Sequence, residues 1–83
     1  MKQPDPTTLL TQVCVFEKYG PRLTVQQLGE VFGLRPASVR NAISAGTFPV
    51  ATYVDGIRRF ADYRDVAAHI DAKRAEAREA QTT

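Results

Sequence analysis

The sequence predicts a mainly α-helical domain with one small β-hairpin, in the order helix, helix, helix, hairpin, helix. Two short helical segments meet at a glycine, Gly33, which can end the first of them. A β-rich run that follows is interrupted by Asp55-Gly56, a strong hairpin signal. A last helical segment begins at Asp62. These observations together indicate a winged helix-turn-helix.

Length and composition limit the class of protein. The chain has 83 residues, which is enough for one domain. Hydrophobic residues make up 43% and charged residues 24%, so the chain is too apolar to be disordered. We expect no membrane span and no secretory signal at Met1-Lys2-Gln3-Pro4-Asp5. The single cysteine, Cys14, cannot form an internal disulfide and fits a reducing cytoplasm.

The first predicted helix begins at Asp5-Pro6, with Asp5 as N-cap, and ends at Gly20-Pro21. We expect Cys14 to pack as a small hydrophobe. The apolar residues at helical spacing are Leu9, Leu10, Val13 and Phe16. These residues are usually core, but this helix is extra to the minimal domain. Leu9, Val13 and Phe16 are therefore also candidates for a dimer interface.

The second and third predicted helices form the helix-turn-helix. Thr24 lies three residues before Gln27, as in a capping box, and Gly33 can stop the helix. The third helix covers about 36–45 and is closed by Gly46. A small residue is needed where the two helices touch, and Gly29 lies there. The apolar residues expected between the helices are Leu28, Phe32, Leu34, Val39 and Ala42.

The predicted hairpin, or wing, covers 50–60, with strands at 50–54 and 57–60 on either side of Asp55-Gly56. Asp62 then caps a final helix. Its inward residues are Tyr63, Val66, Ala67 and Ile70. We therefore expect a flexible N-terminus at 1–5, a winged helix-turn-helix domain at 6–71, and a charged helical extension at 72–83 that frays into a disordered tail.

Positive charge is concentrated in the middle of the chain. The whole chain has a formal net charge of +2. Residues 1–34 are neutral and residues 65–83 carry −1, whereas residues 35–64 carry five arginines against two aspartates, a net charge of +3. The planar guanidinium of arginine suits both phosphates and the edge of guanine. The charge distribution therefore favours double-stranded DNA as the partner.

The predicted frame assigns candidate DNA contacts. A recognition helix enters the major groove with its N-terminal part nearest the bases. The residues expected on that face are Arg35, Ala37, Ser38, Arg40, Asn41 and Ser44. Arg40 and Asn41 are the candidates for base reading, because arginine can bridge guanine and asparagine can pair with adenine. Thr24, Gln26 and Arg35 are placed for phosphates. Arg58 and Arg59 follow the wing tip, and the sequence does not decide which of them faces DNA.

Several segments resemble a known family. They are Leu23-Thr24-Val25-Gln26-Gln27-Leu28-Gly29, Arg40 through Gly46, Phe48-Pro49, Asp55-Gly56, Arg58-Arg59-Phe60 and Asp65-Val66-Ala67. Together they resemble the excisionase-type, MerR-like winged helix domain. The first helix and Asp65-Val66-Ala67-Ala68-His69-Ile70-Asp71 also resemble small pyocin-activator-like phage regulators. The resemblance covers about residues 8–75 and implies a phage or plasmid protein that controls promoters or directs recombination. Ile57 departs from it, because excisionases often carry a basic residue there.

These observations lead to one main function and two alternatives. We expect a sequence-specific DNA-binding protein, most simply a repressor that binds as a homodimer or multimer, with a dimer on an inverted repeat. We also expect it to be a cytoplasmic, bacterial protein that associates with the nucleoid when bound. One alternative is an excisionase, whose monomers bind side by side on direct repeats and bend the DNA. Another is a protein-interaction module with a winged fold. We expect no enzyme, cofactor, small-molecule ligand or metal site, because no nucleophile–base pair, metal-ligand cluster or phosphate loop is present in the sequence. His69 is expected to be a surface or partly buried side chain.

Overall fold

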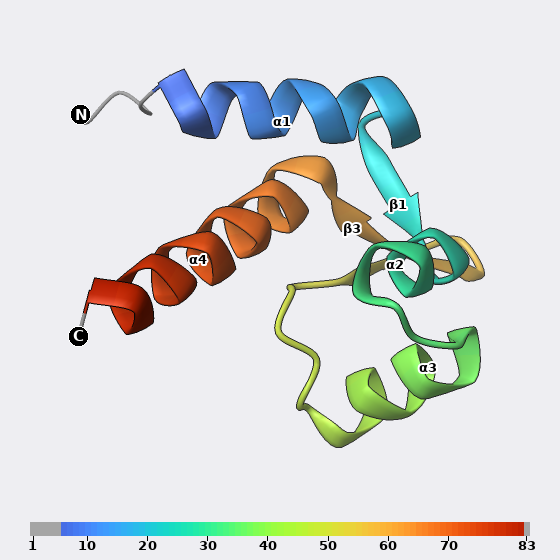
Figure 1. The fold of residues 1–83 in the computed structure, drawn as a ribbon. Coiled ribbons are helices and arrows are strands. Elements are labelled where there is room, and N and C mark those ends of the chain that lie inside the picture. Colours follow the sequence, from blue (N-terminus) through green and yellow to red (C-terminus); the bar gives the residue numbers. More distant parts are fainter. Residues whose placement is uncertain (1–5, 83) are drawn as a thin grey trace.

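The computed structural model describes residues 6–82 and shows a mainly helical fold with a three-stranded antiparallel sheet (Figure 1). The predicted helices and hairpin are present, and one strand is added that the sequence did not predict. The flexible segment predicted at 1–5, with Asp5 as N-cap, lies outside the described residues. The elements are α1 (Pro6–Tyr19), β1 (Arg22–Thr24), α2 (Val25–Phe32), α3 (Pro36–Ala45), β2 (Tyr53–Asp55), β3 (Arg58–Asp62) and α4 (Tyr63–Thr82).

The predicted ends of α2 and α3 are confirmed. The Gln27 backbone N–H donates to Thr24 Oγ1 at 3.2 Å, and the Thr24 N–H donates to Gln27 Oε1 at 3.0 Å, which completes the capping box. Gly33 and Gly46 follow the two helices with φ values of 68° and 73°. This left-handed conformation favours glycine and lets the chain turn directly after each helix.

The hairpin is shifted along the chain from the predicted position. Its strands cover 53–55 and 58–62 rather than 50–54 and 57–60, and Asp55 pairs with Arg58. The two loop residues are therefore Gly56 and Ile57, so the prediction of Asp55-Gly56 as the turn is wrong by one residue. Gly56 has a φ of 67° and Ile57 has a negative φ. A positive φ at the first loop position only is the pattern of a type II′ turn, which places glycine first.

Strand β1 was not predicted because it has only three residues between Pro21 and the start of α2. It pairs with β3 through Arg22–Asp62, Leu23–Ala61 and Thr24–Phe60, so the sheet order is β1-β3-β2. Leu23 is fully buried. This pairing fixes the start of α2 against the base of the hairpin.

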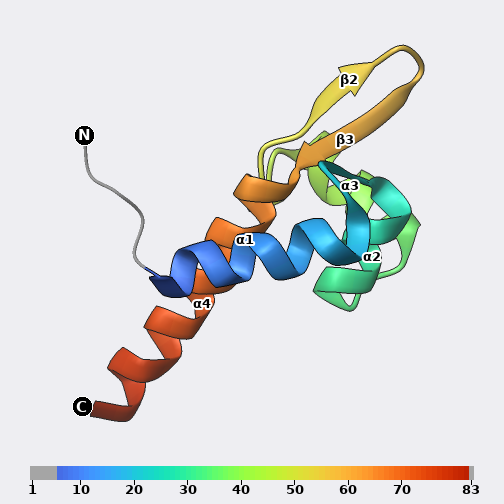
Figure 2. The ribbon, with the colours of Figure 1, turned by 90° about the horizontal axis from the view of Figure 1, so that it is seen from above.

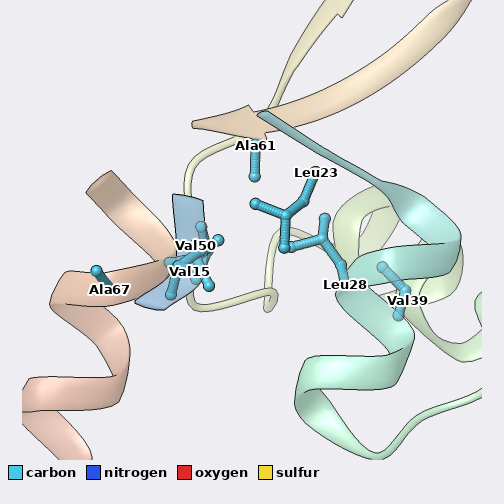
Figure 3. Packing of buried hydrophobic residues seen from close by; sticks show 8 residues of the cluster. Val15, Leu23, Leu28, Val39, Val50, Ala61 and Ala67 are labelled. Carbon is cyan, nitrogen blue, oxygen red and sulfur yellow. The ribbon is translucent and has the colours of Figure 1, made fainter. Parts of the chain in front are cut away.

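The core lies where the sheet meets the helices. Figure 3 shows Leu23 between Ala61 of β3 and Leu28 of α2, and all three are fully buried. Val50 is also buried, so this residue lies in the core rather than in the predicted strand. Burial of a valine or leucine side chain contributes about 1.5–3 kcal/mol to stability. The buried cluster comprises Val15, Leu23, Leu28, Val39, Val50, Ala61, Val66 and Ala67.

Helix α1 turns most of its predicted apolar stripe toward solvent. Val15 is its buried side chain, and the inward face also carries Thr11, whose hydroxyl donates to Asp71 of α4 at 2.7 Å. The interpretation of Cys14 as a packed hydrophobe is wrong, because Cys14 is exposed. The apolar residues of α1 that lie 46–65% exposed are Leu9, Leu10, Val13 and Phe16. These four residues are therefore not core residues of the folded chain.

Helix α4 runs without interruption from Tyr63 to Thr82, and its residues 72–81 are exposed (Figure 2). Val66 and Ala67 are fully buried, whereas Ile70 remains 37% exposed. The His69 ring is partly buried and lies 4.8 Å from the Phe32 ring, so this histidine packs between α4 and α2. Within residues 6–82, no helix is both long and apolar enough to cross a membrane.

Asp62 caps α4 as predicted and should make the stability depend on pH. Its carboxylate accepts from the Arg64 backbone N–H at 2.8 Å and from the Arg64 side chain at 2.9 Å. The Arg64 side chain lowers the pKa of Asp62 below its ordinary value of 3.8. A lowered folded-state pKa stabilises the fold above the unfolded-state pKa, and this contribution is lost as pH falls through the folded-state value.

We expect Asp62→Ala to lower the free energy of unfolding by about 1 kcal/mol at pH 7, because an N-cap is lost. The difference from the unmodified protein should shrink as pH falls below 3.8, since the carboxylate is then protonated first in the unfolded state and, below its lowered folded-state pKa, in the folded state as well. Urea unfolding between pH 2.5 and 7 measures both quantities. Asp62→Asn is the control, because asparagine keeps the cap without the charge. A pH-independent deficit for Asp62→Ala would contradict the role given to the carboxylate.

Candidate nucleic-acid interface

A hollow of about 570 Å³ lies between α3, the start of α2 and the tip of the β2–β3 hairpin. It brings together residues that are far apart in the sequence and come from the end of β1, from α2, from α3 and from the hairpin. Six residues predicted to contact DNA line it, whereas Arg35, Ala37, Ser38 and Asn41 do not. The lining residues are Thr24, Val25, Gln26, Arg40, Ile43, Ser44, Ile57, Arg58 and Arg59.

The position of α3 depends on a close approach between α2 and the following turn. Both Gly33 and Leu34 donate their backbone N–H groups to the Gly29 carbonyl oxygen. A Cβ at Gly29 would lie 2.5 Å from the Leu34 carbonyl oxygen, so the predicted need for a small residue here is confirmed. Leu28 and Val39 fill the space between the helices and are fully buried. Leu34 does not fill it, because its side chain is 44% exposed; this prediction is wrong.

Helix α3 covers Pro36–Ala45, the range predicted for the recognition helix. Its buried residue, Val39, anchors it to the core. Helical spacing places Ala37, Arg40, Asn41 and Ser44 on the opposite face, and all four are exposed. Ser38 is exposed at the edge of this face. The face is therefore open along its whole length, and the Arg40–Ser44 side of it borders the hollow.

Arg35 occupies the N-cap position of α3 in an extended conformation and is exposed. Among the described residues, its side chain caps none of the first-turn N–H groups. Backbone N–H groups at a helix N-terminus attract anions, because they lack partners within the helix. In α3, Pro36 has no N–H and the Val39 N–H donates to the Arg35 carbonyl oxygen at 3.1 Å. The N-terminal end of α3 therefore offers the Arg35 guanidinium and the N–H groups of Ala37 and Ser38.

The two arginines of β3 differ in how they are held. Successive strand residues point to opposite faces, so Arg59 shares the face of the buried Ala61, and Arg58 shares the face of Phe60. Arg59 is partly buried, and its Nη1 donates to Thr52 Oγ1 at 3.0 Å. Arg58 is exposed. Both line the hollow; Arg59 is oriented by its hydrogen bond to Thr52, whereas Arg58 is solvent-exposed.

The hollow is strongly electropositive. Three arginines line it, and no carboxylate of residues 6–82 does. The nearest acid along the chain, Asp55, accepts a hydrogen bond from Arg22 Nη1 at 2.7 Å, which raises the pKa of Arg22. The guanidinium of Arg22 also lies 3.8 Å from the centre of the Phe60 ring. Arg22 therefore holds the negative charge of Asp55 on the sheet face that carries Phe60.

Free positive charge remains where DNA contacts were predicted. Arg64 is paired with Asp62 at 2.9 Å and so adds little net charge to the surface. In contrast, the other arginines of the basic segment make no ion pair with any part of residues 6–82; these are Arg35, Arg40, Arg58 and Arg59. Because these cations are unpaired, they can neutralise the charge of an anionic partner without first breaking an ion pair.

Four residues of this region were not predicted. Arg22 was missed because its role depends on the pairing of β1, which the sequence did not indicate. Val25 and Ile43 were missed because they are apolar, and their positions near the hollow follow from the tertiary structure. Ile57 was noted only as a departure from the family pattern, and its side chain is fully exposed. The sequence signal that could have identified Ile57 was its position directly after Gly56, at the turn of the predicted hairpin.

Comparisons of the chain with protein-family models, with curated proteins and with solved structures found no match. Residues 6–82 contain no group of His, Cys, Asp or Glu side chains that could hold a metal ion. The function therefore has to be inferred from the residues of the hollow and of the exposed face of α3.

Proposed function

We propose that this protein has a winged helix-turn-helix fold and binds double-stranded DNA sequence-specifically, most simply as a transcriptional repressor from a phage or plasmid. The observation that carries the proposal is the hollow between α3 and the hairpin, which is lined by Arg40, Arg58 and Arg59 without a carboxylate from residues 6–82. DNA affinity depends largely on neutralising phosphates. A concave basic surface beside an exposed helix suits a duplex.

In the proposed complex, α3 is the recognition helix and lies in the major groove. Arg40 and Asn41 read base edges, because both are exposed on one face of α3. Arg35 and the N-terminal N–H groups of α3 contact phosphates, together with Thr24 and Gln26 at the start of α2. The hairpin is the wing and places Arg58 and Arg59 along the adjacent backbone or minor groove.

Two copies are expected on one operator, because one module of this size reads only a few base pairs. The α1 residues Leu9, Val13 and Phe16 are 48%, 55% and 46% exposed, and they line one side of the helix. Figure 1 shows α1 and α3 at opposite ends of the molecule, with α2 between them. A second copy bound at α1 would therefore leave α3 uncovered.

The charge of the hollow also separates this proposal from a protein-interaction module. Such a module needs a surface that is largely apolar at its centre. The hollow instead gathers three unpaired guanidinium groups. The excisionase alternative uses the same DNA-binding surface, and the two differ in how copies are arranged on the duplex.

Selection of binding sites from a random duplex library at physiological salt tests the proposal. We expect enrichment of one sequence as an inverted repeat, with half-sites about one helical turn apart. Enrichment of a direct repeat would instead favour an excisionase. If no sequence is enriched while the protein remains folded by circular dichroism, the proposal of sequence-specific DNA binding fails.

A further inference from the structure

Ile57 lies at the tip of the hairpin and has no role in the folded domain. It is the second of the two loop residues, and its side chain is 100% exposed. The second position of a type II′ turn has a negative φ and accepts most residues, so the turn does not require an isoleucine. Ile57 therefore neither fills the core nor is required by its turn. A function outside the folded chain would explain this choice of residue.

The surroundings of Ile57 indicate a nucleic acid rather than a protein. The Ile57 side chain lines the same hollow as Arg40, Arg58 and Arg59. Figure 2 shows that the hairpin projects beyond the helices, so its tip extends from the body of the molecule. A protein interface of ordinary size buries about 800 Å² on each partner, which one side chain beside two arginines does not supply. A basic ribbon with an apolar tip can follow a DNA groove.

An isoleucine cannot bond a phosphate or a base edge. It gains free energy from a duplex only where it leaves water for an apolar surface. The faces of stacked base pairs are such a surface, and they become accessible when one step opens toward the minor groove. Arginines next to the apolar residue would hold the hairpin at the backbone on either side of that step.

We propose that Ile57 is a wedge that enters a base step in the minor groove next to the site of α3, and that it bends the duplex. This inference depends on the proposed DNA-binding function and makes it more specific: the partner is a deformable duplex. The preferred steps are TA and CA/TG, because pyrimidine–purine steps unstack most easily. Sequence preference should therefore extend to a position that no polar side chain reads.

The test uses the full chain and the duplex obtained by selection. Energy transfer between dyes at the two DNA ends reports bending, and 2-aminopurine placed at successive positions reports unstacking of one step. We compare the unmodified protein with Ile57→Ser and with Val54→Ser. Val54 is the matched control, since it is 57% exposed on the same hairpin but does not line the hollow.

We expect the unmodified protein and Val54→Ser to bend the duplex and to raise 2-aminopurine fluorescence at one pyrimidine–purine step. Ile57→Ser should lose both signals and bind several-fold more weakly, with an unchanged salt dependence because its arginines remain. The inference is overturned if Ile57→Ser bends the duplex as the unmodified protein does. It is also overturned if the unmodified protein binds its selected site without bending, an outcome that leaves the proposed function intact. If no site is selected at all, the proposed function fails, and the inference fails with it.

Discussion

Gly29→Ala should lower the free energy of unfolding by about 1–3 kcal/mol, even though alanine is the better helix former. The added methyl group would lie 2.5 Å from the Leu34 carbonyl oxygen, which belongs to the backbone and cannot rotate away. The turn and α3 would have to move together. For a domain of this size, each kcal/mol corresponds to about 4–8 °C in Tm. Thermal unfolding followed by circular dichroism measures the shift.

The matched control is Gly33→Ala, which adds the same methyl group four residues later. A Cβ there meets no atom of residues 6–82 within 4 Å, so its only cost is the left-handed backbone at a φ of 68°. That cost is about 1–2 kcal/mol. The sign of the Gly29 effect is decisive, because a glycine in an uncrowded helix interior would gain about 1 kcal/mol on replacement by alanine. A stabilised Gly29→Ala variant would show that α2 does not approach the turn this closely.

Much of the fold followed from local chemistry. Thr24 and Gln27 satisfy each other's backbone N–H groups, and Gly33 and Gly46 adopt left-handed conformations, so the limits of α2 and of α3 could be predicted from short-range interactions alone. Strand β1 could not, because three residues have no periodicity to detect. Its pairing with β3 is a long-range interaction, in which Leu23 lies opposite Ala61 and is buried in the core.

The errors have a common physical origin in tertiary packing. On α1, spacing alone could not decide which side faces α4: Leu9 and Val13 are exposed, whereas the Phe16 ring, although 46% exposed, packs at 5.1 Å against the Tyr63 ring of α4. At the hairpin, Asp55-Gly56 matched the commonest turn, but the register set by Asp55 and Arg58 moved the loop by one residue. That shift places Ile57, rather than Gly56, at the second loop position.

The candidate interface was predictable in its polar residues and not in its shape. Arg40, Arg58 and Arg59 were identified from local charge and helical spacing, and the structure brings them to one hollow. Sequence could not show that Arg22 pairs with Asp55, since this needs the ordering of three strands. This ion pair compensates the charge of the carboxylate that lies across from Arg58 in the hairpin.

Arg40→Ala should change which DNA sequence the protein prefers, and this is the second large effect expected. Arg40 is exposed on the face of α3 that borders the hollow and makes no ion pair within residues 6–82. A bidentate arginine–guanine contact contributes about 1–3 kcal/mol of discrimination. We therefore expect about 5- to 150-fold weaker binding to the selected site and a loss of preference at one base pair. Repeated selection with the variant, with titrations against point-substituted duplexes, measures both.

The double variant Arg58→Ala and Arg59→Ala separates base reading from attraction to the backbone. Each lost phosphate contact should reduce the slope of log K against log salt by about 0.9, whereas the preferred sequence should persist. Arg74→Ala on the exposed end of α4 is the control for charge alone, since Arg74 lies outside the hollow.

If Arg40→Ala weakens all duplexes equally and keeps the same preference, Arg40 contacts the backbone. Base reading would then have to come from other residues on the exposed face of α3, with Asn41 the first to test.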